Sequence, residues 1–89
     1  MDFEWNPEKA RRNHRLHGVS FPEAAEVFGD ELSSTVADPD HSQGENRYLT
    51  FGQARSGRYL VVAFTERAGR IRLISARTMT RRERKAYED

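Results

Sequence analysis

The chain contains no cysteine, which excludes a disulfide-stapled scaffold, a thiolate zinc site and a cysteine nucleophile. No apolar run approaches the roughly 18 residues that a membrane-spanning helix needs. The first five residues carry acids and no apolar stretch, so they do not resemble a secretory signal. We therefore expect a cytoplasmic protein without membrane contacts. Its 89 residues are enough for a single domain, which we predict to span residues 1–89.

Lysine is also scarce, with two Lys against thirteen Arg. The first fifty residues hold five bases and ten acids, whereas residues 51–89 hold ten bases and four acids. Arginine is favoured where a planar donor fork holds phosphate or carboxylate. A high-GC genome would produce the same preference for arginine, but it does not explain the clustering in the C-terminal half. The asymmetry indicates an anionic partner, either RNA or an acidic protein.

The first helix signal is the segment Asn6-Pro7-Glu8, in which Asn6 can cap a helix that Pro7 begins. Gly18 is typical of a helix end, so we predict a helix over about 7–17. This helix has almost no large apolar residues. We expect Phe3 and Trp5, in a short strand just before it, to supply the missing burial.

A second helix is predicted from Ser20-Phe21-Pro22-Glu23, which has the spacing of a capping box. Apolar residues follow with helical periodicity as far as Phe28, and Gly29 ends the pattern. A second capping box, Thr80-Arg81-Arg82-Glu83, predicts a short terminal helix over 81–88.

Strand-forming segments fill most of the chain between these helices. We predict four strands, at residues 32–37, 47–54, 59–65 and 70–77. A polar loop over 38–46 separates the first two, and short turns containing glycine join the last three as an antiparallel meander. The predicted class is therefore α+β: an antiparallel sheet of about four strands, with two N-terminal helices packed on one face and a short C-terminal helix.

The last strand carries the main candidate site. Strict alternation puts Arg72 on one face and Arg77 on the other, unless a bulge shifts the register or Arg77 lies past the core edge. A guanidinium on a sheet interior is costly without an anion. Arg72 therefore either faces a phosphate or pairs across strands with Glu66 or Glu45. The candidate phosphate-binding residues of this region are Arg70, Arg72, Arg77, Arg81 and Arg82.

The first predicted helix carries a polar stripe of Lys9, Asn13 and His17 at spacing i, i+4, i+8. These side-chain types suit a phosphate-binding or RNA-cleaving face, although a solvated face explains them almost as well. His14 and His17 lack a third metal ligand on their face, and the 38–46 loop does not match a calcium loop. We expect no metal site and no cofactor.

The chain resembles the BrnT family of bacterial type II toxins over nearly its whole length. The residues that carry the resemblance are, in order, Phe3-Glu4-Trp5-Asn6, Lys9, Asn13, His17 to Ala24, Asp38 to Ser42, Glu45-Asn46-Arg47, Gly52, Val61-Val62, Thr65-Glu66-Arg67, Arg70 to Arg77, Arg82-Glu83 and Tyr87. Two departures are Leu16, where members often have a basic residue, and Asn6 in place of a frequent Asp.

The resemblance implies a RelE-like microbial ribonuclease fold and a metal-independent endoribonuclease that cleaves mRNA and inhibits growth. It implies a cognate BrnA-type antitoxin as partner, with contact to DNA only indirectly through the antitoxin. The residues that match the family's motifs are Lys9, Asn13, His17, Arg72, Arg77, Glu83 and Tyr87.

The mechanism that follows as a hypothesis is attack of a ribose 2′-oxygen on the adjacent phosphate, with arginines stabilising the added charge. We predict Arg72 and Arg77 for that role, and His17, Lys9 or Glu83 as general base and acid. The predicted RNA-binding residues are Arg70, Arg81, Arg82, Asn13 and Tyr87. The alternative is a non-catalytic module that binds nucleic acid or protein.

Overall fold

The computed structural model describes residues 1–38, 40 and 46–89 of the chain. The predicted loop over 38–46, including Glu45 and His41, therefore lies largely outside the described residues. The described elements, in chain order, are β1 (Phe3–Glu4), α1 (Pro7–His17), α2 (Phe21–Glu26), the 3-10 turn η1 (Val27–Gly29), β2 (Ser34–Ala37), β3 (Arg47–Gln53), β4 (Tyr59–Arg67), β5 (Arg70–Thr78) and α3 (Arg81–Glu88).

The described strands form one sheet in the order β1-β5-β4-β3-β2. Four of them pair antiparallel, whereas β1 runs parallel to β5, with Phe3 opposite Ile71. The α+β class is confirmed. The expected sheet of about four antiparallel strands is wrong, because the Phe3 segment joins the sheet as a fifth, parallel strand. The expected RelE-like architecture is not matched in this respect.

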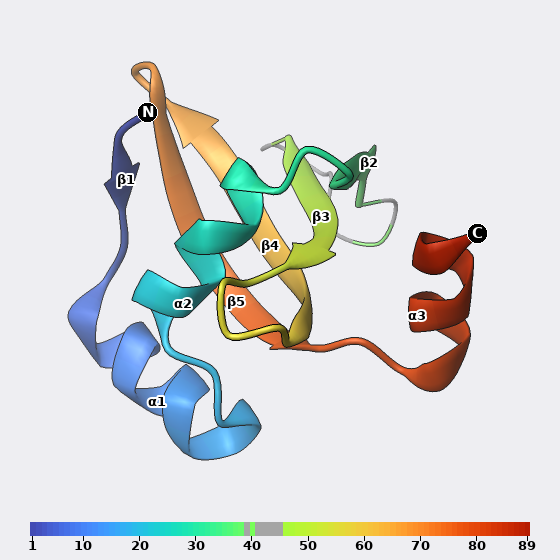
Figure 1. Cartoon of the computed structure of the whole chain (residues 1–89). Coiled ribbons are helices and arrows are strands. Elements are labelled where there is room, and N and C mark those ends of the chain that lie inside the picture. Colours follow the sequence, from blue (N-terminus) through green and yellow to red (C-terminus); the bar gives the residue numbers. More distant parts are fainter. Residues whose placement is uncertain (39, 41–45) are drawn as a thin grey trace.

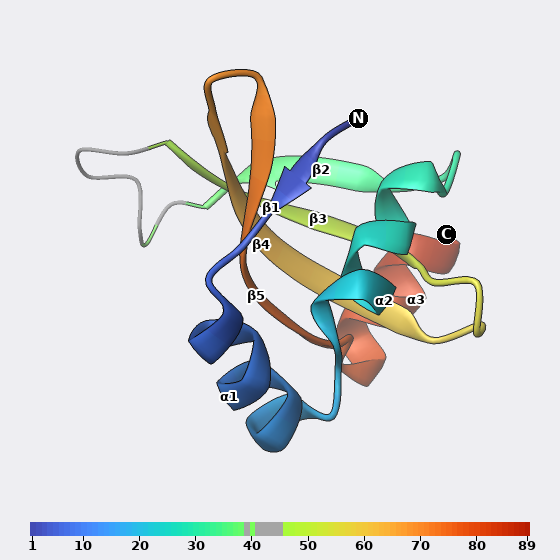
Figure 2. The same ribbon diagram turned by 90° about the vertical axis from the view of Figure 1, so that its left-hand side faces the viewer.

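The sheet separates α3 from the other two helices (Figures 1 and 2). The core lies on the α2 side, where Phe21 and Val27 pack with Leu60, Val62 and Leu73. We call the opposite side the open face, because α3 is the one described helix that lies over it. No helix in the described part of the chain has both the length and the apolarity to cross a bilayer.

The helix α1 lies along the β5 edge of the sheet and is fixed there by Asn13. The Asn13 amide donates to the carbonyl oxygens of Val19 (3.0 Å) and Ala76 (2.9 Å). Its oxygen accepts from the Ala76 N–H at 3.0 Å. The carboxamide thus pairs with Ala76 much as a neighbouring strand would, at a point that the short β1 does not reach.

The helix ends follow the sequence signals, with one exception. Asn6 caps α1, and Gly18 ends it in the left-handed conformation at φ 67°. Thr80 and Glu83 form the predicted reciprocal capping box of α3. The Ser20 hydroxyl caps α2 by accepting from the Glu23 N–H. The expected return bond of this capping box, from the Ser20 N–H to the Glu23 carboxylate, is wrong, because that carboxylate binds Arg58 instead.

Candidate phosphate-binding site

A β-bulge in β5 brings the two central arginines to the same face. Ala63 pairs with Ser75 and Phe64 with Leu73, so Ile74 is the extra residue. Arg72 lies opposite Thr65 and Arg77 opposite Val61, and these partners are four residues apart in a regular strand. Both arginines therefore project onto the open face, as the bulge alternative predicted.

The cross-strand pairings order the open face into rows. One row runs through Arg47, Thr65 and Arg72 to Glu4, and a second runs through Phe51 and Val61 to Arg77. Four strand residues separate the two rows, or about 13 Å along the sheet. Because of this separation, the Cα atoms of Arg72 and Arg77 lie at different distances from any one phosphate bound on the open face.

Arg77 forms a two-point ion pair with Glu83 from the first turn of α3. Its two terminal nitrogens donate to the two carboxylate oxygens at 2.7 and 2.9 Å. The hydrogen bond with Arg77 lowers the pKa of Glu83 to about 2, and Glu83 in turn raises the pKa of Arg77. The Arg77 side chain stays 42% exposed, so a ligand can reach it from solvent.

Arg72 is held by Glu4 of the parallel strand β1, at 2.7 Å. Glu4 also lies 3.9 Å from Arg70. Sequence reasoning proposed Glu66 or Glu45 as partners for Arg72 and missed Glu4. Glu4 reaches Arg72 because β1 pairs in parallel with β5. No local sequence pattern predicts this pairing of distant segments.

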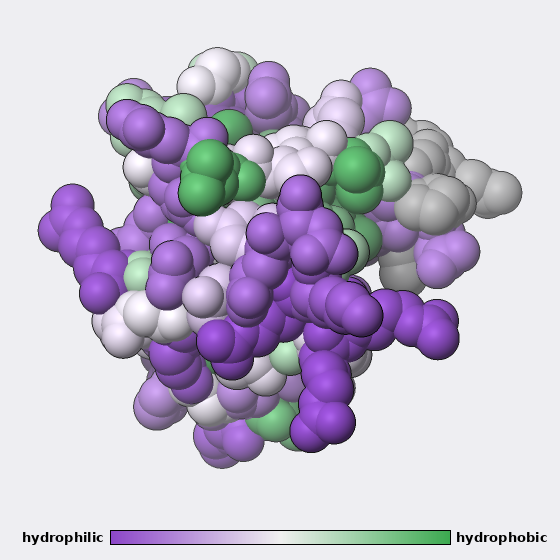
Figure 3. Space-filling model, turned by 45° about the vertical axis from the view of Figure 1, so that its right-hand side comes forward, coloured by the Kyte–Doolittle hydropathy of each residue, from purple (hydrophilic) through white to green (hydrophobic). Residues whose placement is uncertain are grey.

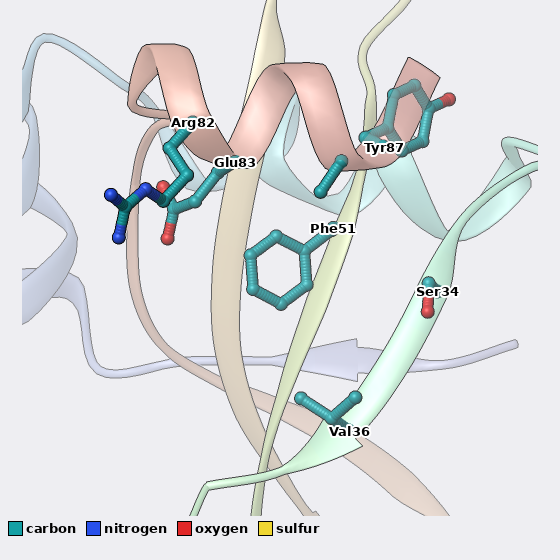
Figure 4. A pocket seen from close by; sticks show the side chains of 7 residues that line it. Ser34, Val36, Phe51, Arg82, Glu83 and Tyr87 are labelled. Carbon is teal, nitrogen blue, oxygen red and sulfur yellow. The ribbon is translucent and has the colours of Figure 1, made fainter. Parts of the chain in front are cut away.

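A groove of about 310 Å³ lies between α3 and the open face. Figure 4 shows the Phe51 ring beneath α3, with Arg82 and Glu83 at one end and Tyr87 at the other. Ser34, Val36 and Ala86 complete the lining. On the side of the molecule shown in Figure 3, hydrophobic patches interrupt an otherwise hydrophilic surface. The Arg77–Glu83 pair thus stands beside a groove with a largely apolar lining.

The remaining predicted residues of α3 have different surroundings. Arg81 and Arg82 are exposed, and Arg82 lines the groove. The Tyr87 hydroxyl donates to the Asp30 carboxylate, and burial together with this bond raises the pKa of Tyr87 to about 12. This contact, together with Tyr87 packing against Tyr59, ties α3 to the rest of the molecule.

The structure separates the predicted α1 stripe into buried and exposed members. Lys9 and His17 are exposed, one turn on either side of Asn13. Asn13 is 6% exposed and its carboxamide is fully used in the contacts to Val19 and Ala76. We therefore leave Asn13 out of the proposed RNA-binding residues. Lys9 and His17 lie near the β5 edge, because Asn13 binds the residue immediately before Arg77.

Among the described residues, no group of three or more His, Asp or Glu side chains is arranged to hold a metal ion. The charged side chains that the structure brings together are instead guanidinium–carboxylate pairs. Fold and site together define a small α+β protein with arginine forks on one sheet face, beside a groove.

Comparison with known proteins identifies the family. A sequence profile described as "Ribonuclease toxin, BrnT, of type II toxin-antitoxin system" matches residues 5–83. The chain therefore belongs to the BrnT family of ribonuclease toxins, as its motifs predicted. Such a toxin has RNA as its substrate and a protein antitoxin as its partner.

The fold has a counterpart among solved structures. The crystal structure of the Brucella abortus ribonuclease toxin BrnT superposes with a TM-score of 0.67 at 19% sequence identity, covering 91% of this chain and 99% of that one. Among curated proteins no sequence matches.

Proposed function

We propose that the chain is a metal-independent endoribonuclease that cleaves by internal transesterification. The ribose 2′-oxygen bonds to the adjacent phosphorus while the bond from phosphorus to the 5′-oxygen breaks. The 2′-hydroxyl gives its proton to a base, and the leaving 5′-oxygen takes one from an acid. The products are a 2′,3′-cyclic phosphate and a 5′-hydroxyl.

The observation that carries this proposal is the two-point Arg77–Glu83 pair beside the groove. A carboxylate and a phosphate offer the same pair of acceptors to a guanidinium fork. Glu83 therefore holds Arg77 in the orientation that a scissile phosphate would use. When RNA binds, its phosphate replaces Glu83 on the fork, and Arg77 stabilises the charge that develops on the phosphorane.

Proton transfer falls to Lys9 and His17 rather than to Glu83. A general base works best with a pKa near the operating pH. Arg77 holds the pKa of Glu83 at about 2 while the two are paired, and hydrogen bonding with Thr80 still lowers the pKa of Glu83 when phosphate takes its place on Arg77. Lys9 and His17 flank Asn13, which binds the residue next to Arg77. An RNA strand on Arg77 can therefore reach both side chains at the β5 edge, with Arg72 contacting a neighbouring phosphate.

The partner in this proposal is a BrnA-type antitoxin that inhibits by covering the groove and Arg77. An acidic antitoxin segment would compete for the same guanidinium fork. DNA contact would come only through the antitoxin, since none of the helices in the described part of the chain has the features of a recognition helix.

The test is cleavage of single-stranded RNA in the presence of EDTA, with analysis of the product ends. The wild type should give cyclic-phosphate ends, whereas Arg77→Ala should lower cleavage at least a hundredfold, the scale of losing one charge-stabilising donor. Arg55→Ala removes an exposed arginine in the β3–β4 turn and is the matched control, with cleavage near that of the wild type. Loss of cleavage on adding EDTA would overturn metal independence.

The alternative of a non-catalytic binding module predicts a different result. Such a protein would bind RNA without producing new ends, and Arg77→Ala would change affinity alone. Undiminished cleavage by Arg77→Ala would remove Arg77 from the site.

A further inference from the structure

The folded chain pairs four of the nine arginines of residues 51–89 closely with carboxylates. Four arginines there have a carboxylate within 3 Å, namely Arg58, Arg72, Arg77 and Arg84, with partners Glu23, Glu4, Glu83 and Glu88. These four pairs provide a shaped site, but each pair by itself adds no net positive charge to attract a polyanion.

The opposite holds for α1, which lies in the acidic half of the sequence. Lys9, Arg11, Arg12 and Arg15 are exposed, and none has a carboxylate within 4.0 Å among residues 1–38, 40 and 46–89. Glu8 is the one acid of this helix. Like charges one turn apart, such as Arg11 and Arg15, destabilise a helix unless an anion lies against them.

Three of the side chains on α1 border a hollow. Arg11, His14 and Arg15 line a depression of about 370 Å³ between α1 and the start of α2, together with Ala10, Ser20, Phe21 and Pro22. The hollow lies on the α2 side of α1, so it is separated from the open face by the β5 edge of the sheet. It is thus a second basic surface, distinct from the Arg77 groove.

We propose that Arg11, His14 and Arg15 form a second RNA-binding site, which holds the sugar-phosphate backbone of the strand beyond the cleavage site. This inference rests on the proposed cleavage of RNA at Arg77. Sequence-independent affinity for RNA comes from cations that release counterions, and the unpaired cations of α1 supply them. The paired arginines of the open face contribute little to this affinity until phosphate displaces their carboxylates.

RNA fits the hollow better than an acidic protein segment does. Arg11 and Arg15 stand about 5–6 Å apart at their Cβ atoms, so two forks project side by side from one helix face. An acidic peptide is the competing occupant, and the experiment separates the two.

The experiment measures binding of a single-stranded RNA oligonucleotide whose 2′-hydroxyls are methylated, so that it cannot be cleaved. Fluorescence anisotropy gives the dissociation constant between about 50 and 200 mM salt. Arg11→Gln/Arg15→Gln should reduce the slope of log affinity against log salt by about 1.4, because each single-strand phosphate contact contributes about 0.7. Arg11→Lys/Arg15→Lys keeps the charge and should keep the slope.

The control is Arg55→Gln/Arg67→Gln, which removes the same formal charge from the β3–β4 turn and from the last residue of β4, and should leave the slope unchanged. An unchanged slope for Arg11→Gln/Arg15→Gln, with helicity retained by circular dichroism, overturns the proposal. Loss of binding to a polyglutamate peptide with RNA binding unaffected overturns it in favour of a protein partner. If the slope falls as expected but the wild type cuts no RNA, the second site stands and the cleavage proposal falls.

Discussion

Glu83 is the residue on which several interactions converge. Its carboxylate binds both terminal nitrogens of Arg77 and also accepts from the Thr80 N–H at 2.8 Å. The same side chain therefore orients Arg77 and caps α3. A local helix-capping signal, visible in the sequence, thereby positions a group of the candidate site.

The low pKa of Glu83 predicts a specific loss of stability in acid. The Glu83 carboxylate binds a proton less readily in the folded protein, where its pKa is about 2, than in the unfolded chain, where its pKa has the ordinary value of 4.5. Its stabilisation is complete above about pH 5 and is lost as the pH falls toward 2. Because the Arg77 side chain is 42% exposed, solvent weakens the ion pair. We expect the pair to contribute about 1–2 kcal/mol to the free energy of unfolding at neutral pH.

The measurement is urea unfolding of the wild type and Glu83→Gln at a series of pH values. The difference in unfolding free energy should be largest at neutral pH and should disappear near pH 2. Glu31→Gln, which removes an exposed acid, should give a small difference that does not follow this pattern. A Glu83→Gln difference that stays constant with pH would contradict the assigned pair.

At the scale of elements, several features were predictable from short stretches of sequence. Asn6, Gly18 and Thr80 mark helix ends because capping depends on neighbouring backbone groups. The position of β1 was not predictable in this way, since Phe3 pairs with Ile71 far along the chain. The bulge at Ile74 was foreseen as one of two alternatives, because alternation alone does not choose between them.

The attachment of α1 to the sheet depends on one side chain. Asn13→Ala leaves the Ala76 N–H and the carbonyls of Val19 and Ala76 without their partners in a buried site. We expect the free energy of unfolding to fall by about 3 kcal/mol, measured by urea denaturation. Arg12→Ala on the exposed side of α1 is the control and should change it by about 0.5 kcal/mol or less. An equal effect of both variants would show that Asn13 does not anchor the helix.

At the scale of the whole molecule, the fold redistributes the charge that the sequence displays. The arginines of the last strand were predicted from the sequence. Glu4, which neutralises Arg72, is 68 residues away in the chain, so the sequence alone did not predict this ion pair. The basic residues of α1 lie in the first fifty residues, in which acids outnumber bases. Only the structure shows that they have no carboxylate partner among the residues that it describes.

This redistribution predicts that removing one acid strengthens RNA binding more than its charge alone would. Glu4→Gln frees Arg72, so phosphate no longer has to displace a carboxylate there. The salt dependence of binding to uncleavable RNA should steepen by about 0.7, the contribution of one phosphate contact made by an unpaired cation. Glu31→Gln makes the same change in net charge and should leave the slope as it is. Equal slopes for the two variants would mean that Arg72 does not reach the RNA.

The bulge in β5 makes the residue count of this strand part of the site. In a strand of the same length without a bulge, strict alternation would turn Arg77 toward the α2 side and Ala76 toward the open face. Because Ile74 is the extra residue, deleting its codon would leave Leu73 opposite Phe64 and Ser75 opposite Ala63 in a regular ladder, with Arg72 and Arg77 still on the open face. A single-codon loss at this one place should therefore keep both the phosphate ligand and the docking point of α1.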